Sequence, residues 1–463
     1  MLMNIDEKFL PFEQRLREAG LNELLIDNFK YNYIRLLNND LGFLPEKDIT
    51  PVTSLPSLVD LTNEDQKIGD EHLNQVVVIK LNGGLGTNMG LERAKSLLPV
   101  KGNLSFLNII TEQVLHHHLP LLFMNSFNTH DDTQKSLKEY KKLNQSLPID
   151  FIQHKVLKIN AKDLSPAIYP KQRELEWCPP GHGDLYIAAH ACGILDMMLD
   201  QKYTFAFVSN ADNLGAVIDG RILGYMVRNH LDFLMEVVDR TARDRKGGHL
   251  AMQDGRFTLR EIAQCPETDK QFFEDIKRHR YFNTNNLWLN LKSLKRLLHK
   301  VDYSLPLPLI VNRKHIDPVD HESPEIYQLE TAMGAAIAVF DNASALNVPR
   351  SRFAPVKNTN ELLLVSSDYY ELLDTYQLVP ANPAADSFVT IELDHHYYKF
   401  IKDFNERFPF GVPSLKDCRR LVVQGNVYWG KNIRCEGDVV ISNSTDIPQI
   451  IPSDTTISGK LSW

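Results

Sequence analysis

Between residues 80 and 100 the chain combines a glycine loop with a later lysine, two features that proteins use to hold phosphate. The segment reads KLNGGLGTNMGLERAKSLLPV and follows the apolar run VVVI. Its first three glycines let successive backbone N–H groups approach anionic oxygens, because no Cβ stands in the way: Gly83, Gly84 and Gly86. Lys95 follows nine residues after Gly86. The spacing predicts a strand, a phosphate-binding loop and a lysine that reaches a polyphosphate.

Two common phosphate loops are rivals to this interpretation. A P-loop needs a lysine and a hydroxyl residue directly after its last glycine, whereas Gly86 is followed by Thr87 and Asn88, so that motif is excluded. A dinucleotide-binding loop is a closer rival, since the spacing G-x-G-x-x-x-G is present. Its acidic residue would be Glu112, which lies in a helix-like segment rather than at a strand end. The dinucleotide loop stays as the weaker alternative.

A carboxylate with a candidate metal-binding role follows the apolar run YTFAFVSN at 203–210. Asp212 would stand at the carboxyl end of a strand, where open α/β sheets place ligands. Such a carboxylate can hold Mg²⁺, which prefers oxygen ligands and bridges phosphates. The simpler alternative is an aspartate that caps a helix.

Composition sets the class of protein. The chain has 463 residues, 43% hydrophobic and 24% charged, as expected for a globular protein of two or three units. A net charge of -8 argues against nucleic acid as a partner. The first residues do not read as a signal peptide, no apolar stretch approaches the ~20 residues that span a bilayer, and five scattered cysteines show no C-x-x-C spacing. We therefore expect a cytoplasmic protein without a membrane partner.

The elements that must position these residues alternate along the chain. The first ~70 residues show helical periodicity, and strand-like and helix-like runs alternate from residue 76 onward. This alternation predicts an α/β fold with a mainly parallel sheet, made mixed by a hairpin at Asp254-Gly255. The run at 184–199 predicts one helix. We expect a helical segment at 1–70, a catalytic domain at 71–384 and a third domain at 385–463.

The C-terminal domain shows a six-residue period. Apolar residues recur in two lanes, the first at Leu421, Val427, Ile433, Val439, Ile451, Ile457 and Trp463, and the second at Val423, Trp429, Cys435, Ile441 and Ile447. This period predicts the stacked coils of a parallel β-helix, which we expect to be left-handed. Ordinary strands spaced by turns are the alternative. The open end of such a stack is a candidate surface for homo-oligomerisation.

Seven blocks in the same order resemble the UTP–glucose-1-phosphate uridylyltransferase family. They are LNGGLGTNMG…AKS, WCPPGHGDLY, FVSNADNLGA, KGGHLA, FNTNNLW, QLETAMGAAI and VPRSRFAPVK, and they span roughly residues 75–370. The sequence departs from the family in two places. Arg93-Ala94 stands where the family has Gly-Pro, and Leu157 replaces a proline in QHKVLK.

The resemblance implies a Rossmann-like nucleotidyltransferase domain and an Mg²⁺-dependent reaction of UTP with glucose 1-phosphate. The phosphate oxygen of the sugar phosphate would attack the α-phosphorus of UTP in line, so that UDP-glucose forms and pyrophosphate leaves. Related alternatives are a UDP-sugar or UDP-N-acetylhexosamine pyrophosphorylase, and a non-catalytic regulator that binds nucleotide sugars.

The resemblance also implies roles for individual residues. UTP would be held by Leu81, Asn82, Gly83, Gly84, Gly86, Thr87, Gln153 and Gly181. The sugar phosphate would contact His182, Asn210, Asn283, Asn285, Glu330 and Lys357. Lys95 would stabilise departing pyrophosphate, Lys357 would bring positive charge to the α-phosphate, and Asp212 would hold the metal. His182 would act as a hydrogen-bond donor rather than as a base.

Overall fold

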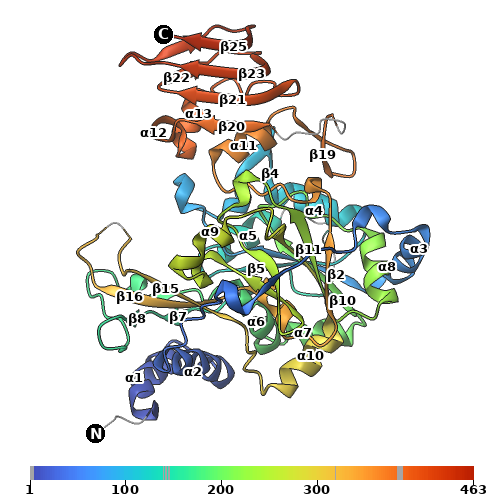
Figure 1. The fold of residues 1–463 in the computed structure, drawn as a ribbon, viewed down its shortest axis with the longest axis vertical. Helices are drawn as coiled ribbons and strands as arrows, with labels where there is room; N and C mark the ends of the chain where they lie inside the picture. Colours follow the sequence, from blue (N-terminus) through green and yellow to red (C-terminus); the bar gives the residue numbers. More distant parts are fainter. Residues whose placement is uncertain (1–4, 139, 141–142, 144–145, 319, 383–388) are drawn as a thin grey trace.

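A ten-stranded mixed sheet forms the centre of the protein in a computed structural model (Figure 1), which describes all residues except 1–4, 139, 141–142, 144–145, 319 and 383–388. Its parallel centre runs in the order β10-β2-β5-β6. These strands are β10 (Phe205–Asn210), β2 (Val76–Asn82), β5 (Leu121–Asn125) and β6 (Asp150–Ile152). The expected mixed α/β class with a mainly parallel sheet is confirmed.

Strands with mostly antiparallel pairing extend the sheet on the other side, where only β17 pairs in parallel, with β11, among the described strands. β14 (Tyr281–Asn290) pairs with β10, β11 and β12, and the remaining members are β1 (Thr50–Pro51), β11 (Phe233–Asp239), β12 (His249–Gln253), β13 (Arg256–Arg260) and β17 (Ala343–Asn347). The predicted hairpin joins β12 to β13, with Asp254 and Gly255 both at positive φ. That conformation matches the right-handed twist of the paired strands.

Helices cover both faces of the sheet, which explains why β2 is apolar at nearly every position. Val76 and Val78 pack into one buried cluster, and Val77 and Ile79 pack into another on the opposite face. The covering helices are α4 (Phe106–His116), α5 (His130–Leu137), α6 (Leu185–Ala191), α7 (Ile194–Asp200), α8 (Gly220–Arg228), α9 (Lys270–Phe273) and α10 (Leu291–Lys300). The run at 184–199 forms two helices rather than the single helix expected, because Gly193 at φ +78° ends the first of them.

The N-terminal residues form the helices α1 (Ile5–Glu18), α2 (Glu23–Leu37) and α3 (Asn63–His72). An aromatic cluster joins α1 to α2, with Phe12 and Tyr33 ring centroids 4.9 Å apart. The same buried cluster includes Leu157, which belongs to β7 (Val156–Leu157), paired with β9 (Trp177–Cys178). The leucine that replaces the family's proline thus packs against the N-terminal helices.

A second, smaller sheet lies beside α1 and α2 in Figure 1. It has the order β15 (Leu309–His315), β16 (Glu325–Thr331) and β8 (Ile159–Asn160), with antiparallel pairing throughout. Two short hairpins complete the body, formed by β3 (Pro99–Lys101) with β4 (Leu104–Ser105) and by β18 (Tyr370–Leu372) with β19 (Leu378–Pro380). No helix in the described part of the chain has the length and apolar character that crossing a membrane requires.

The C-terminal residues form parallel ladders that stack at one end of the molecule in Figure 1. One ladder has the order β20 (Thr390–Leu393), β21 (Cys418–Gln424), β23 (Arg434–Ser442) and β25 (Thr456–Ser462), and β22 (Val427–Trp429) pairs with β24 (Gln449–Ile451). The helix α11 (Thr359–Ser366) contacts both β20 and β3 of the body, while α12 (His395–Tyr398) packs with α13 (Ile401–Arg407), which contacts β22. Most residues of the two apolar lanes are buried, but Ile447 is 69% exposed, so its predicted inward position is wrong.

Candidate active site

The glycine loop follows β2 directly at the carboxyl edge of the parallel strands. Gly86 has φ +72°, a left-handed conformation that favours glycine. A Cβ on Gly83 would lie 3.0 Å from Gln153 Oε1, and Gln153 Nε2 donates to the carbonyl oxygen of Gly181 at 2.8 Å. The structure therefore brings three of the predicted nucleotide-binding residues together.

The side chain of Asn82 is committed to the fold. Its Nδ2 donates to Asn125 Oδ1 at 2.8 Å and to Thr133 Oγ1 at 2.9 Å, and the residue is 3% exposed. Leu81 pairs with Asn210 across β2 and β10, so both stand at the strand ends. Asn82 can therefore offer a ligand only its backbone. Thr87 and Gly84 lie exposed in the loop.

Lys95 and Asp212 form an ion pair beside the loop. Lys95 Nζ lies 2.6 Å from Asp212 Oδ2, with the two side chains only 14% and 21% exposed. The backbone N–H of Lys95 donates to the carbonyl oxygen of Gly84 at 3.2 Å, which ties the lysine to the glycine loop. Asp212 Oδ1 is buried and has no hydrogen-bond partner among the described residues. One oxygen of this carboxylate is therefore available to a further ligand.

The departure from the family at Arg93-Ala94 preserves the backbone that precedes Lys95. Ala94 has φ -50°, within the range that a proline would impose. Its N–H donates to Asp132 Oδ2 at 3.0 Å, and Arg93 lies 3.3 Å from the same carboxylate. The hydrogen bond from Ala94 and the ion pair of Arg93 fix this backbone to Asp132. A proline at 94 would have no N–H to donate.

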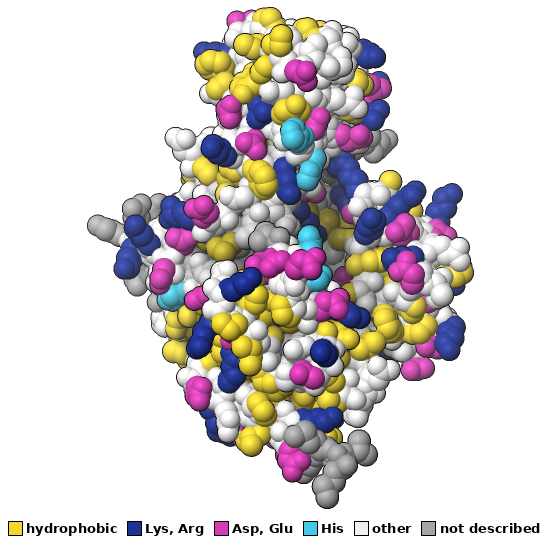
Figure 2. All heavy atoms as spheres, turned by 90° about the vertical axis from the view of Figure 1, so that its left-hand side faces the viewer, with side chains coloured by type: hydrophobic (Ala, Val, Ile, Leu, Met, Phe, Trp, Pro, Cys, Tyr) yellow, Lys and Arg dark blue, Asp and Glu magenta, His cyan; other side chains and the backbone are white. Residues whose placement is uncertain are grey.

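Lys357 reaches this region because its segment runs along the Asp212 loop. The N–H of Val356 donates to the carbonyl oxygen of Asp212 at 3.1 Å, and Pro355 bridges to Asn213. Lys357 lines a cavity of about 680 Å³ and a neighbouring one of about 480 Å³. Figure 2 shows a hollow between the C-terminal part and the body, with lysine and arginine side chains at its rim.

His182 is partly buried in the loop before α6 and is neutral. Burial, with the positive charge of Lys357 as a second cause, lowers the pKa of His182 to about 4. Its Nδ1 accepts a hydrogen bond from the N–H of Met333 at 2.9 Å, so the ring proton is on Nε2. In this tautomer Nε2 can donate a hydrogen bond.

Asn283 and Asn285 form an irregular stretch of β14. Asn283 Nδ2 donates to Asn285 Oδ1 at 2.8 Å, and Asn285 has φ +59°. The pairing of β11 with β14 shifts register at this point, which marks a β-bulge. Bulges re-aim side chains next to binding sites, and this one leaves Asn285 outside the regular ladder while Asn283 still pairs with Val237.

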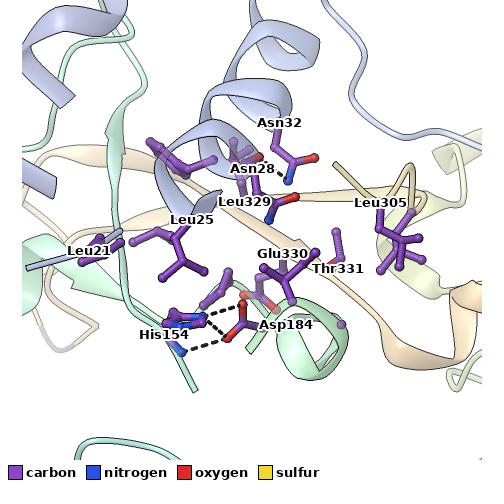
Figure 3. Close-up of a pocket in the computed structure, with 16 residues that line it drawn as sticks. Leu21, Leu25, Asn28, Asn32, His154, Asp184, Leu305, Leu329, Glu330 and Thr331 are labelled. Carbon is purple, nitrogen blue, oxygen red and sulfur yellow. Dashed lines mark hydrogen bonds and ion pairs between the residues drawn. The ribbon is translucent and has the colours of Figure 1, made fainter. Parts of the chain in front are cut away.

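Glu330 lies in a different environment from these two asparagines. A Cβ on Gly181 would lie 3.1 Å from Glu330 Cβ, so the glutamate is adjacent to the His182 loop. It lines a cavity of about 30 Å³ between that loop and α2, where Figure 3 shows it with Asn28, Asn32 and Asp184. Burial raises the pKa of Glu330. The residues that line this cavity do not include Asn283 or Asn285.

A buried polar network fixes the Asp212 and Lys357 segments relative to the sheet. Arg352 and Glu236 form an ion pair at 2.7 Å, with exposures of 8% and 0%. The carbonyl oxygen of Arg352 accepts from Asn213 Nδ2 at 3.1 Å, and Asn213 Oδ1 accepts from the N–H of Ala354 at 2.9 Å. The network thus holds in place the segments that carry Asp212, proposed to bind the metal, and Lys357, proposed to contact the α-phosphate.

Comparison with known proteins assigns this arrangement to one family. The family model for UTP–glucose-1-phosphate uridylyltransferase matches residues 26–436. The chain belongs to this family. A uridylyltransferase of Pyrus pyrifolia is 40% identical over 412 residues, which cover 86% of this chain and 84% of that one, and a Hordeum vulgare relative is 41% identical over 84% and 81% of the two chains.

Solved structures of the family share the fold. A point mutant of UDP-glucose pyrophosphorylase from Leishmania major, in complex with UDP-glucose, has a TM-score of 0.93 at 40% identity and covers 99% of this chain and 100% of that one. A UDP-glucose phosphorylase from Trypanosoma brucei has a TM-score of 0.89 at 40% identity over 98% and 99% of the two chains. The N-terminal helices and the C-terminal ladders are thus part of the shared architecture.

The structure adds one residue that the sequence reasoning missed. Glu261 follows β13 and faces the family block KGGHLA, because a Cβ on Gly248 would lie 2.5 Å from Glu261 Oε1. Burial raises the pKa of this carboxylate, and the positive charge of Lys357 opposes that effect. Glu261 therefore shares an electrostatic environment with Lys357 and His182. Within the sequence, the paired glycines of KGGH were the signal that another group approaches the backbone there.

Proposed function

We propose that the protein transfers a uridylyl group from UTP to glucose 1-phosphate and releases pyrophosphate. The observation that carries this proposal is the convergence of Lys95, Asp212 and Lys357 beside the glycine loop, in a chain of the uridylyltransferase family. The phosphate oxygen of the sugar phosphate would attack the α-phosphorus, and the bond to the β-phosphate would break. Both substrates are polyanions, so positioning and charge neutralisation supply the catalysis.

The nucleotide would lie against the loop at Gly83, Gly84 and Gly86, with Gln153 at the uracil side. The contact between Gln153 and Gly181 supports this assignment, since it sets the amide beside the glycine backbone. Lys95 would leave Asp212 for the β- and γ-phosphates and stabilise the charge that develops on pyrophosphate. Lys357 would face the α-phosphate from its own segment.

Mg²⁺ fits the carboxylate of Asp212. Its Oδ1 is buried without a partner, whereas no group of three or more His, Cys, Asp or Glu side chains in the described part of the chain could form an all-protein metal site. Mg²⁺ suits such a site because it retains waters and takes phosphate oxygens as ligands. When bound, it would neutralise phosphate charge. Asp212 would hold it, with Asn210 nearby at the strand end.

The sugar phosphate would be bound by neutral donors and by carboxylates. His182 supports this role because its Nε2 carries the proton while its pKa of about 4 keeps the ring uncharged. The amides of Asn283 and Asn285 can donate to and accept from hydroxyl groups, and Glu261 and Glu330 can accept. These groups suit a sugar rich in hydroxyls.

The C-terminal lanes support a left-handed parallel β-helix as a third domain, at 385–463, after a helical segment at 1–70 and a catalytic domain at 71–384. The parallel ladders carry buried apolar residues every six positions, such as Leu421, Val427 and Val439. The end of the stack at β25 would offer a surface for homo-oligomerisation. A cytoplasmic location agrees with the five cysteines, which are all free.

The direct test measures pyrophosphate release from UTP with Mg²⁺ and one of three sugar phosphates: glucose 1-phosphate, galactose 1-phosphate or N-acetylglucosamine 1-phosphate. We expect glucose 1-phosphate to give the highest kcat/KM. Preference for another sugar would favour the related pyrophosphorylases, and no turnover with any of them would favour a non-catalytic regulator.

A matched pair of variants tests the site itself. Lys357→Met should lower kcat by about 100-fold, the scale on which a single group that stabilises transition-state charge acts. Lys399→Met removes the same charge from the same 480 Å³ cavity and should change kcat less than that. Equal losses in the two variants would contradict the role proposed for Lys357.

A further inference from the structure

Lys80 also lines a further cavity, apart from the three described above. It has a volume of about 130 Å³ and is enclosed by β2, β10, the end of α4 and the β18–β19 hairpin. About half of the residues that line it are apolar, including Val78, Val114, Phe207 and Ile218, and the rest are polar, among them Gln113 and His117. In other proteins an apolar cavity of about 150 Å³ holds a benzene ring. The space therefore suits a small ring or a short aliphatic chain.

Lys80 places a cationic group at this cavity. The residue is 1% exposed, and its Nζ donates to Ser209 Oγ at 2.7 Å and to the carbonyl oxygen of Ala216 at 2.9 Å. An ammonium has three hydrogens, and no acceptor for the third lies within hydrogen-bond distance among the residues that the structure describes. Both of the acceptors present are neutral.

Among the residues that the structure describes, no carboxylate forms an ion pair with Lys80. Glu236 is the acidic group whose charge reaches it, and that carboxylate already pairs with Arg352 at 2.7 Å. Burial, with the positive charge of Arg352, lowers the pKa of Lys80 to about 7. A cation that is buried without an opposite charge is costly, so an anion that enters the cavity would gain free energy by pairing with it.

A hydroxyl group at the same cavity is also without a partner. Thr375 Oγ1 is buried, and no hydrogen-bond partner for it occurs in the described part of the chain. Thr375 lies in the β18–β19 hairpin, and the neighbouring carbonyl oxygen of Tyr376 accepts from Gln113 Nε2 of α4 at 2.9 Å. That contact holds the hairpin against α4. The exposed residues His116 and Gln377 line the cavity on its solvent side.

We propose that this cavity is a binding site for a small organic carboxylate, whose carboxylate group pairs with Lys80 and Thr375 while its apolar body fills the space against Phe207 and Val114. The site is separate from the one assigned to UTP and the sugar phosphate. Ala216 connects it to the candidate active site, since this residue lies four positions after Asp212. The carbonyl oxygen of Ala216 accepts a hydrogen bond from Lys80 Nζ.

Benzoate is a suitable probe, compared with the neutral isostere benzamide and the cation benzylamine. Binding to the full-length protein can be measured by ligand-observed NMR and calorimetry without substrates, so the result does not depend on catalysis. We expect benzoate to bind with a millimolar or lower Kd, at least ten times more tightly than benzamide, and benzylamine not to bind. Equal binding of benzoate and benzamide, or no binding of benzoate, would overturn the proposal.

Two variants locate the binding. Lys80→Met should abolish benzoate binding because it removes the buried charge. Thr375→Trp should also abolish it, because an indole in the hairpin fills the cavity and leaves Lys80 in place. The control Leu373→Trp adds the same ring two residues away, at a side chain that is 42% exposed and does not line the cavity, and should bind benzoate as the parent protein does. Retained binding in folded Thr375→Trp would reject this site even if Lys80→Met failed to fold.

Discussion

Replacement of Lys95 by methionine should have opposite effects on metal binding and on catalysis. Lys95 Nζ and Asp212 Oδ2 pair at 2.6 Å, so the carboxylate proposed to hold the metal is engaged by the lysine proposed to hold pyrophosphate. A divalent cation that binds Asp212 before the nucleotide must compete with the ammonium group. Without the lysine, that competition and the repulsion between two cations both disappear.

The size of the effect follows from the burial of the pair. The two side chains are 14% and 21% exposed, so the pair is better shielded than the exposed salt bridges that contribute about 0–1 kcal/mol. A hydrogen bond to a charged group contributes about 1.5–3 kcal/mol. Since about 1.4 kcal/mol corresponds to a factor of ten, Lys95→Met should tighten metal binding by about 10- to 100-fold in the absence of nucleotide.

Mn²⁺ binding followed by electron paramagnetic resonance measures this affinity directly, with Mn²⁺ in place of Mg²⁺. The matched control is Arg93→Met, which removes the same charge from the same loop at a side chain that is 66% exposed and pairs with Asp132. That control should change Mn²⁺ affinity by less than about three-fold, because the charge it removes is screened by solvent. Turnover by Lys95→Met should nevertheless fall by about 100-fold or more. Unchanged or weaker Mn²⁺ binding in Lys95→Met would refute the competition between lysine and metal.

Three further predictions concern the groups around this pair. Arg352→Met should lower the free energy of unfolding, measured in urea, by about 3–5 kcal/mol, because it leaves the Glu236 charge buried without its partner. The double variant Arg352→Met/Glu236→Gln should recover much of this loss. A double variant less stable than Arg352→Met would contradict the explanation. Because the pKa of His182 is lowered to about 4, the ring stays neutral above about pH 5. The pH profile of kcat/KM should therefore have the same shape in His182→Gln as in the parent protein. An inflection near pH 6.5 in the parent that is absent from His182→Gln would show that the histidine titrates there. Gly248→Ala should displace Glu261, since the added Cβ would lie 2.5 Å from its Oε1, and should raise the KM for glucose 1-phosphate while the KM for UTP stays within two-fold; equal KM changes for both substrates would argue against a sugar-specific role of Glu261.

Much of the fold and of the candidate site could be predicted because the relevant signals are local. The apolar run at 76–79, the glycines behind it and the strand before Asp212 each depend on a few neighbouring residues. Parallel strands then bring their carboxyl ends to one edge, which is why Lys95 and Asp212 could be assigned to one site before their 2.6 Å contact was known. The helical run at 184–199 was misjudged because a single glycine, Gly193, overrides an apolar pattern that continues through it.

Long-range packing decided the features that the sequence left open. The ion pair between Arg352 and Glu236 and the contact of the Lys80 ammonium with Ser209 join residues from distant parts of the chain, and the approach of Glu261 to Gly248 depends on how the β12–β13 hairpin folds back. Periodicity could not place Ile447, since that residue lies in the loop between β23 and β24, outside both ladders.

By itself, the sequence determined the class of fold and predicted a phosphate loop with the charged groups to serve it, because these depend on residue type and short spacing. Only the tertiary structure decided which of those charges meet and which lack a partner. Lys95 has Asp212 within 2.6 Å, whereas Lys80, fifteen residues earlier, donates to two neutral oxygens and lies 5.6 Å from the centre of the Phe207 ring. The physical reason is that the state of a buried charge depends on the groups that surround it in space, and these come from strands and loops more than a hundred residues away.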